Sequence, residues 1–430
     1  MKILSTRKYS LEKIMRLIRN RQSNTVKVEK TVKRIIKFVR KNKDKALFAL
    51  TKKFDGVALK RLGVSKKEII EAYSKENAEV IKALKKAKNN IEKFQKSCLQ
   101  RKEEKVQTTK GVQVWREFRP VEKVGLYIPG GQAAYLSTVL MLGIPAKIAG
   151  CKEIVLCVPP DKTGKVQGAV LIAADLCGIS KIYKVGGAQA IAAMAYGTET
   201  IPKVYKIFGP GNNYVTTAKM LVYGEVGIDM PAGPSEVLIY ADESAKPAWV
   251  AADLLSQLEH GADSQAILIT ESKKLAKRVE IEIFKQSVLL SRREIVKKSL
   301  KNSFIIIVKN LDEASNLINQ YAPEHLEVVS KGEAEVLKKI NNVGSVFLGK
   351  YSSEPLGDYA TGSNHTLPTA GYAKMFSGLS VEDFGKKIQV QKVSKIGIKN
   401  LKTTVEVLAS REGLGAHKNA ISIRFTQPHF

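Results

Sequence analysis

The sequence has few cysteines and no long apolar segment. Its four cysteines, Cys98, Cys151, Cys157 and Cys177, form no CxxC pair, which favours reduced thiols over a disulfide framework. No stretch reaches the roughly 18–20 apolar residues that a membrane helix needs. The N-terminal "MKILSTRKYSLEKIMRLIRN" contains no continuous apolar run, so no signal peptide is indicated. We therefore expect a cytoplasmic protein without a membrane segment.

Acidic residues are also scarce relative to basic ones. The chain carries 71 Lys and Arg against 41 Asp and Glu, a net charge of +30. Residues 1–110 hold 33 of the basic and 11 of the acidic residues, so most of the excess lies there. Such a segment could bind nucleic acid. The lysines are spread at helical spacing, however, which favours solvated helical faces, and no RNA-binding aromatic signature accompanies them.

The 430 residues are enough for two or three domains. Residues 1–105 have the apolar spacing of helices. From about residue 110, short β-branched runs alternate with helical runs, and a second such series follows "PAGPSE" at 231–236. This pattern predicts an α/β fold with two Rossmann-like parallel-sheet domains and a helical N-terminal segment. The expected ranges are 1–115, 116–235, 236–380 and a small C-terminal element at 381–430.

Glycine-rich turns follow several of the predicted strands. In parallel α/β folds such turns bind phosphate, because the next helix offers free N–H groups there. "PGG" (129–131) and "GPGNN" (209–213) both stand between a strand and a helix. Neither matches GxGxxG, and a plain tight turn explains each equally well.

Four of the five histidines have a carboxylate or an amide nearby in the sequence. The pairs are Gln257 with His260, Glu324 with His325, Asp358 with His365, and Glu412 with His417. Gln257 and His260, at positions i and i+3 of a helical run, would share one face. Imidazole, carboxylate and amide oxygen together suit zinc or a similar divalent ion. Since no thiolate is present, we expect a metal site with room for substrate.

Glu324 and His325, in "APEHLEVV", could alternatively move protons near neutral pH. If strand alternation holds there, the two side chains point to opposite sides, and only an irregular backbone would let both serve one substrate. A Glu–His pair on a loop surface fits the spacing as well.

Several long motifs occur in a characteristic order. They are "VGLYIPGG", "VGGAQAIAA", "GPGNNYVTTAK", "IDMPAGPSEVL", "LLSQLEHGADSQ", "APEHLE", "GDYATGSNHTLPT" and "EGLGAHKNA". With these motifs the sequence resembles the histidinol dehydrogenase family, which carries out the last two steps of histidine biosynthesis. The resemblance is strongest from about residue 115 to the C-terminus.

The resemblance implies a role for each motif residue. It implies one zinc ion per subunit, held by Gln257, His260, Asp358 and His417, with His417 donated across a homodimer interface by the C-terminal element. The same residues would contact L-histidinol, and further substrate contacts would come from Ser235, His325, His365 and Glu412. The contacts to NAD would come from Tyr127, Gln189 and Asn212. Glu324 and His325 would be the catalytic pair.

The implied reaction removes four electrons from a primary alcohol, so two hydrides pass to two NAD molecules in turn. His325 would take the alcohol proton, and Glu324 would activate water against a bound histidinaldehyde. No cysteine nucleophile is required, and the apolar surroundings of Cys151 and Cys157 favour buried structural thiols.

Two departures from the family pattern and two alternatives remain. "SSEPLGDY" has serine where the family often has "TPE", and Lys418 follows His417 where alanine is common; we expect Lys418 to point outward. A related amino alcohol could be the substrate instead of histidinol. A nucleic-acid-binding function ranks low because it leaves the four histidine motifs unexplained.

Overall fold

The computed structural model describes residues 1–19, 25–130 and 135–425. It divides into two compact units: residues 1–96 with 121–384, and residues 97–120 with 385–430. Among the helices of the described ranges, none combines the length and apolar content needed to cross a membrane. The expected boundaries near residues 115, 235 and 380 stay a prediction.

The first unit contains a five-stranded parallel sheet in the order β6-β5-β4-β7-β8. Its strands are β4 (Lys123–Tyr127), β5 (Glu153–Val158), β6 (Lys181–Lys184), β7 (Lys206–Phe208) and β8 (Gly227–Ile228). The helices between them are α5 (Leu136–Ala149), α6 (Gly168–Leu176), α7 (Gly187–Tyr196) and α8 (Asn213–Val222). The central strands are apolar and buried, as expected for a parallel sheet covered on both faces.

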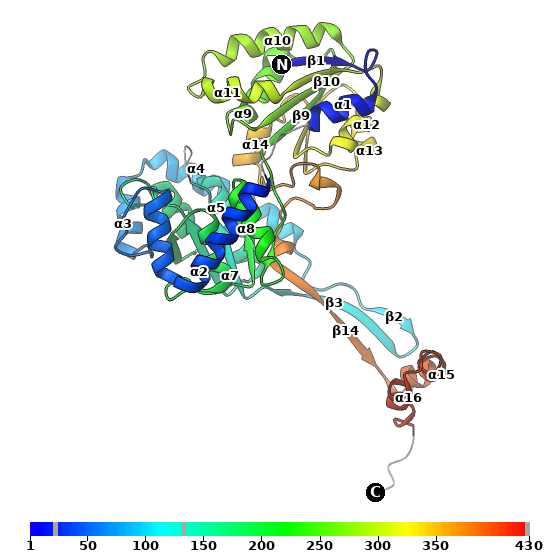
Figure 1. Ribbon diagram of the computed structural model, residues 1–430. Coiled ribbons are helices and arrows are strands. Elements are labelled where there is room, and N and C mark those ends of the chain that lie inside the picture. Colours follow the sequence, from blue (N-terminus) through cyan, green and yellow to red (C-terminus); the bar gives the residue numbers. More distant parts are fainter. Residues whose placement is uncertain (20–24, 131–134, 426–430) are drawn as a thin grey trace. The chain divides into compact units, whose positions relative to one another are not determined.

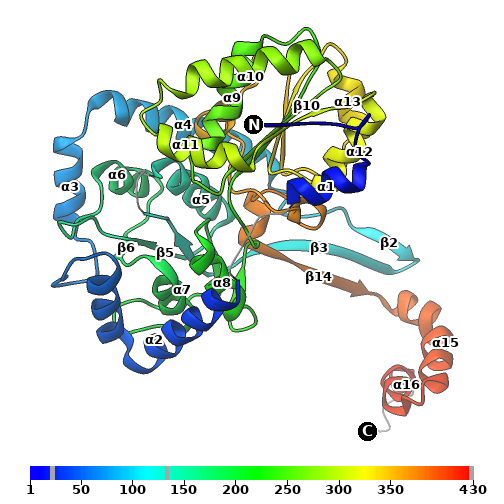
Figure 2. The same cartoon turned by 45° about the horizontal axis from the view of Figure 1, so that its top comes forward.

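The basic N-terminal helices belong to the same compact unit as this sheet, and two of them pack against its helices. They are α2 (Thr25–Phe54), α3 (Lys66–Lys75) and α4 (Ala78–Cys98). Helix α2 is interrupted at Lys43, whose φ is 49°, and it lies beside α7 and α8 (Figures 1 and 2). Helix α3 packs on α6. The apolar faces of these helices are therefore buried, and their lysines lie mostly on the exposed faces.

A second, six-stranded parallel sheet has the order β1-β11-β10-β9-β12-β13. Its strands are β1 (Lys2–Ser5), β9 (Glu236–Ala241), β10 (Gln265–Thr270), β11 (Phe304–Ile307), β12 (His325–Val329) and β13 (Ser345–Leu348). One apolar layer contains α9 (Pro247–Leu258), α10 (Lys273–Ser287) and α11 (Arg293–Ser299), and the other contains α1 (Leu11–Arg19), α12 (Leu311–Tyr321) and α13 (Glu333–Lys339). Helix α14 (Glu354–Tyr359) and three short 3₁₀ turns, Leu300–Asn302, Tyr372–Lys374 and Val381–Phe384, complete this part of the chain.

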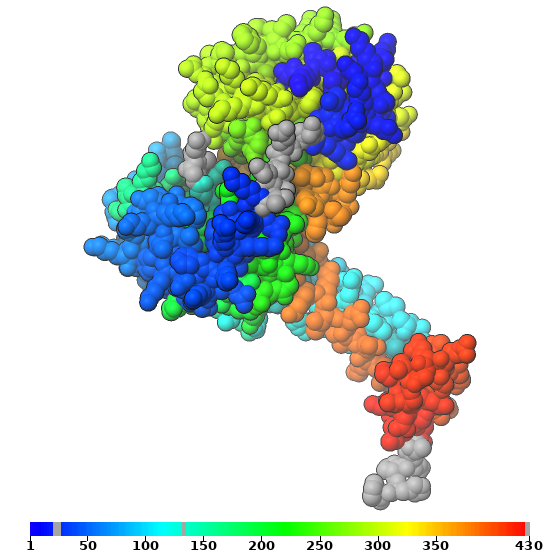
Figure 3. Space-filling view, viewed as in Figure 1, coloured from blue at the N-terminus to red at the C-terminus, as the bar shows by residue number. Residues whose placement is uncertain are grey.

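The first residues differ from the helix that their sequence predicts. Lys2–Ser5 form edge strand β1, which pairs with β11, and only Leu11–Arg19 are helical. Leu4, Ile14 and Ile18 are buried in the core of the second sheet, and α1 packs against α12. Figure 3 shows the N-terminal segment, in blue, on the surface of this part of the chain. A strand of four residues is too short to show a period, so pairing with a distant strand decided its structure.

The second unit is an antiparallel ribbon with two helices. Its strands run in the order β14-β3-β2, with β2 at Val106–Thr109, β3 at Val112–Pro120 and β14 at Gly385–Val393. Helices α15 (Lys395–Arg411) and α16 (Gly415–Ser422) follow. The only buried residues of α15 are Gly397 and Ala409, and α16 has none. Several large apolar side chains are exposed here, namely Ile396, Val407, Leu408, Leu414 and Ile423.

Candidate active site

The candidate site forms where strands β9 and β12 begin. The main-chain N–H of Glu236, the first residue of β9, donates a hydrogen bond to Oε2 of Glu324 at 2.8 Å. The main-chain oxygen of Glu236 lies 3.0 Å from Nδ1 of His325, the first residue of β12. One residue of the neighbouring strand thus holds both members of the Glu324–His325 pair.

The two side chains point the same way, although simple alternation predicts opposite sides. Glu324 Oε2 lies 3.7 Å from His325 Nδ1, and both residues are buried. Glu324 precedes the strand, and two residues earlier Ala322 adopts the left-handed conformation with φ 56°. Since Glu324 is not part of the pleat, alternation does not apply to it. The irregular backbone that a shared substrate would require is present.

The hydrogen bond at Nδ1 determines which nitrogen of His325 can act as a base. A carbonyl oxygen only accepts, so Nδ1 carries the proton and donates it to Glu236. Nε2 is buried, has no hydrogen-bond partner among the described residues, and lies 3.6 Å from Oδ1 of Asp358. When the imidazole is neutral, Nε2 is therefore the nitrogen that can take up a proton.

Gln257 and His260 lie at the end of α9, but not on one helical face as predicted. The helix ends at Leu258, and the His260 N–H reaches the Gln257 carbonyl at 3.4 Å in a turn. Gln257 is buried, and its Nε2 lies 3.3 Å from His325 Nδ1. Its Oε1 is buried without a hydrogen-bond partner among the described residues. The turn, and not a shared helix face, brings Gln257 and His260 into the site.

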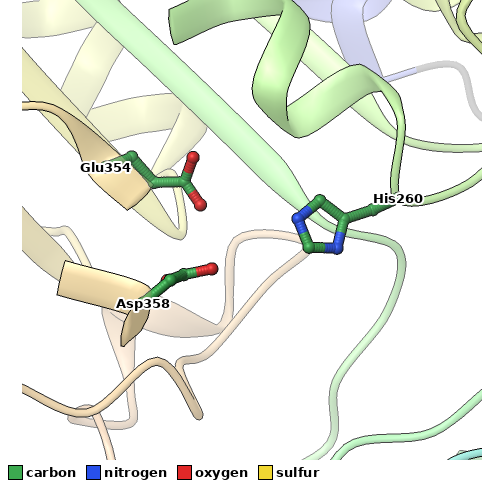
Figure 4. A group of neighbouring side chains, drawn as sticks. All are labelled: His260, Glu354 and Asp358. Carbon is green, nitrogen blue, oxygen red and sulfur yellow. The ribbon is translucent and has the colours of Figure 1, made fainter. Parts of the chain in front are cut away.

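Helix α14 adds two carboxylates one turn apart, Glu354 and Asp358. With His260 they form a group whose ligand atoms all lie within 4.8 Å of one another, and both carboxylates point toward the imidazole (Figure 4). Glu354 accepts a hydrogen bond from Ser256 Oγ at 3.0 Å. Asp358 Oδ1 is buried without a hydrogen-bond partner among the described residues. A carboxylate oxygen and an amide oxygen, both without a hydrogen-bond partner among the described residues, therefore belong to the same small cluster.

The acidity of this cluster is strongly perturbed. Burial raises the pKa of Glu324 to about 8, and burial together with the charge of Asp358 raises that of Glu354 to about 8. Burial alone would lower the pKa of His325, but Glu324 and Asp358 outweigh it and raise the value to about 10. Burial lowers the pKa of His260. Burial would raise the pKa of Asp358, but its interaction with His325, whose Nε2 lies 3.6 Å from Oδ1, and the nearby His365 hold it well below its usual range. Buried acids in excess of local cations favour a divalent ion, whose binding releases protons.

His365 lies at the edge of the same cluster. Its Nε2 is 3.4 Å from Ser137 Oγ and 3.3 Å from Thr138 Oγ1, both at the start of α5. The imidazole also interacts electrostatically with Asp358 and His325, while burial lowers its pKa. His365 thereby links the cluster to the segment that begins α5.

The remaining expected substrate and metal residues occupy two different places. Ser235 immediately precedes Glu236, and its carbonyl accepts from the Gln265 N–H at 3.1 Å. Glu412 and His417 belong to the second unit, at the end of α15 and in α16, and both are exposed. Lys418 is exposed there as well. Within the first unit the cluster accordingly contains three of the four expected metal ligands.

The three expected NAD contacts line one cavity of about 680 Å³. Tyr127 ends β4, Gln189 lies in the first turn of α7, and Asn212 caps α8 by accepting from the Tyr214 and Val215 N–H groups. Gly209 has φ 122°, and a Cβ there would stand 2.1 Å from the Tyr127 oxygen, so only glycine fits this turn. Gly130 also lines the cavity, whereas Gly131, the end of the "PGG" turn, lies outside the described residues.

Comparison with known proteins gives a consistent result. A sequence profile of the histidinol dehydrogenase family matches residues 18–425. The chain belongs to the histidinol dehydrogenase family. The histidinol dehydrogenase of Bacteroides fragilis is 56% identical over 398 residues, which cover 92% of this chain and 93% of that protein. The enzyme of Methanocaldococcus jannaschii is 49% identical over 409 residues, covering 95% of each chain.

The fold also agrees with a solved member of the histidinol dehydrogenase family. The crystal structure of histidinol dehydrogenase from Elizabethkingia anophelis superimposes with a TM-score of 0.95 at 47% identity, covering 99% of this chain and 98% of that one. The predicted α/β fold and the family resemblance are both confirmed.

Sequence reasoning missed Glu236 and Glu354. Glu236 acts mainly through its backbone, which no residue-type pattern reveals. Glu354 could have been found, because it stands four residues before Asp358 in "EPLGDY" and would share its face on a helix.

The cysteine side chains are surrounded as the sequence predicted. Cys157 and Cys177 are buried and Cys151 is partly buried, and burial raises the pKa of Cys151 to about 12.

Proposed function

We propose that this chain catalyses the zinc-dependent, NAD-linked oxidation of L-histidinol to L-histidine through a bound histidinaldehyde, the last two steps of histidine biosynthesis. The proposal rests on family membership across nearly the whole chain. The observation in the site that supports it best is the group of His260, Glu354 and Asp358, which lies with Gln257 beside the buried Glu324–His325 pair.

The donor set fits a zinc ion. Gln257 Oε1 and Asp358 Oδ1 are buried oxygens without hydrogen-bond partners among the described residues, and a cation would satisfy both. His260 supplies an imidazole, and burial lowers its pKa, which favours the neutral form that binds metal. We assign Gln257, His260 and Asp358 as ligands, with His417 as the fourth. Zinc would supply a positive centre that holds the nitrogens of the substrate, and NAD would accept the hydrides.

His325 and Glu324 divide the proton transfers between them. His325 Nε2, free because Nδ1 is bonded to Glu236, takes the proton of the substrate hydroxyl as the first hydride leaves. Its pKa is high only because carboxylates surround it, and added positive charge in the site lowers that pKa. Glu324 then removes a proton from the water that adds to the aldehyde, before the second hydride leaves. Ser235, His365 and Glu412 are the proposed remaining substrate contacts.

The cavity at the ends of β4 and β7 is the proposed NAD site. Its volume of about 680 Å³ lies within the range of about 300–1,000 Å³ typical of small-molecule sites. Helices α7 and α8 begin at this cavity, so the positive ends of their dipoles favour the pyrophosphate there. Tyr127, Gln189 and Asn212 would fix the orientation of the dinucleotide.

The second unit supports a homodimer with shared active sites. Its helices bury almost nothing themselves and expose Val407 and Leu408 at 59% and 57%. An exposed apolar surface of this kind is typical of a subunit interface. A partner subunit would cover it and would receive His417 in its own site.

The test is the amount of NADH formed per L-histidinol consumed, with and without a zinc chelator. We expect about two NADH per substrate, the ratio of a four-electron oxidation, lost on chelation and restored by zinc. One NADH per substrate would contradict the second oxidation step. No NADH from zinc-loaded protein would contradict the proposed reaction, and activity after complete zinc removal would contradict the metal's role.

A further inference from the structure

One carboxylate of the proposed NAD cavity has no partner. Asp55 directly follows α2, and its Oδ2 is buried without a hydrogen-bond partner among the described residues. Burial is the cause that raises its pKa, to about 6. An acidic group is also unfavourable at this end of a helix, where unpaired carbonyl oxygens carry partial negative charge. The position therefore costs stability unless a ligand supplies hydrogen-bond donors.

The other carboxylate of this cavity is already satisfied. Asp161 Oδ1 accepts hydrogen bonds from Thr163 N, Thr163 Oγ1 and Lys165 N, at 2.6–3.0 Å. Lys162 is the one cation among the described lining residues, and it is exposed. Among its described lining residues, the cavity thus has a free acceptor at Asp55 and no cluster of Arg and Lys to bind an additional phosphate.

Asp55 also lies in the part of the cavity formed by α2. That helix contributes Thr31, Ile35 and Phe54 to the lining. Tyr135 lines another part of the cavity, the part nearer to the catalytic cluster. Ser137, only two residues after Tyr135, contacts His365 of that cluster. A dinucleotide whose nicotinamide faces the cluster would place its adenosine half toward α2.

We propose that Asp55 accepts hydrogen bonds from the adenosine ribose hydroxyls of NAD and so excludes dinucleotides that carry a 2′-phosphate. The two oxygens of a carboxylate match the two donors of a vicinal diol, as acidic residues do in other nucleotide-binding parallel sheets. A 2′-phosphate would replace a donor with negative charge beside Asp55. This assignment rests on the NAD-linked function proposed above.

The experiment compares zinc-loaded wild type with Asp55→Asn and Asp55→Ser, using NAD or NADP at saturating L-histidinol. Loss of hydrogen bonds to a charged acceptor should raise the KM for NAD about 10- to 100-fold. The kcat should change little, because Asp55 does not touch the reacting atoms. The preference for NAD over NADP should fall about tenfold or more, since repulsion of the 2′-phosphate is removed as well.

Asp44→Asn is the matched control, because it removes the same charge from the same helix outside the cavity, where the carboxylate is bonded to Thr200. It should leave the KM for NAD and the cofactor preference unchanged. An equal change in Asp44→Asn, or none in both Asp55 variants, overturns the assignment. Thermal melting of each variant checks that it is folded.

Calorimetric titration with ADP-ribose separates this assignment from the proposed reaction. Weaker binding to Asp55→Asn than to wild type supports the role of Asp55 even if histidinol is not turned over, in which case only the proposed reaction fails. Equal binding to the two proteins overturns the role of Asp55 whatever the turnover.

Discussion

In the proposed reaction, Glu324 must take a proton from water near neutral pH. It is buried, bonded to the Glu236 N–H, and its pKa is raised to about 8 by burial. A carboxyl group with that pKa can exchange protons near neutral pH, which an ordinary surface glutamate cannot. Burial therefore makes the Glu324 carboxylate a stronger base than a glutamate exposed to water.

We expect Glu324→Gln to retain zinc and the first oxidation but to stall at the aldehyde. Glutamine keeps the size and can accept the same hydrogen bond from Glu236, yet it cannot take a proton from water. The loss in the second step should be about 10²–10⁴-fold, the usual contribution of a general base. Stopped-flow measurement of NADH should show one equivalent formed fast and the second formed slowly. Full histidine formation at the wild-type rate would remove Glu324 from this role.

At the residue scale, sequence reasoning identified which side chains to consider but not how they are arranged. It placed Glu324 and His325 in one site through family resemblance, whereas strand alternation alone separated them. The left-handed backbone at Ala322 and the bond from Glu236 bring them together. Neither follows from residue type, because alanine rarely adopts that conformation and a backbone N–H is the same for almost every residue.

Among the elements, helix α3 is joined to the first sheet through one glutamate. Glu68 closes the capping box with Ser65, and its Oε1 lies 2.5 Å from Nζ of Lys184 in β6, whose side chain is 7% exposed. The ion pair therefore joins the start of a basic surface helix to an edge strand of the sheet.

We expect Glu68→Ala to lower the free energy of unfolding by about 3–4 kcal/mol, because a buried Lys184 would lose its partner and α3 would lose its cap. Lys184→Met in the same chain should recover part of that loss. Glu71→Ala, which removes an exposed glutamate of the same helix, is the control and should have little effect. Urea unfolding measures all of these variants, and an equal loss in Glu71→Ala would contradict the role of the buried pair.

This pair also makes stability depend on pH with a defined sign. Burial would raise the pKa of Glu68, but Lys184 and Ser65 outweigh it and lower the value to about 2. A lowered pKa in the folded state means that the contribution is complete above the unfolded value of 4.5 and is lost as the pH falls toward 2. In Glu68→Ala this part of the acid dependence should be missing.

At the scale of the whole molecule, the proposed dimer predicts complementation between inactive variants. His260→Ala and His417→Ala should each be inactive alone. After exchange of subunits, half of the dimers contain one of each, and one of their two sites has intact His260 and His417. The mixture should regain about a quarter of wild-type activity. No recovery, although sedimentation shows mixed dimers, would mean that His417 acts within its own chain.

The sequence predicted the two parallel sheets but not the strands that pair across long distances in the chain. The alternation of strands and helices predicted both parallel sheets, because each βα unit is local in the sequence. The ribbon of the second unit was not predicted, since Val112–Pro120 and Gly385–Val393 pair across more than half of the chain. Strand β1 was missed for the same reason: its partner β11 is far away in the sequence. Long-range pairing depends on the folded chain and leaves no periodic signal.

The two sites lie at opposite ends of the strands of their sheets. The catalytic cluster lies where the strands of the second sheet begin, and the cavity lies where the strands of the first sheet end. This difference has an electrostatic consequence. In a parallel α/β sheet the helices run antiparallel to the strands. The helices therefore begin at the carboxyl ends of the strands and end at the amino ends. Helices α7 and α8 start at the cavity proposed to bind NAD, whereas α9 and α12 end beside the Glu324–His325 cluster. About half a positive charge stands at each helix start and half a negative charge at each end. The backbone alone thus favours an anion at one site and a cation at the other, before any side chain contributes.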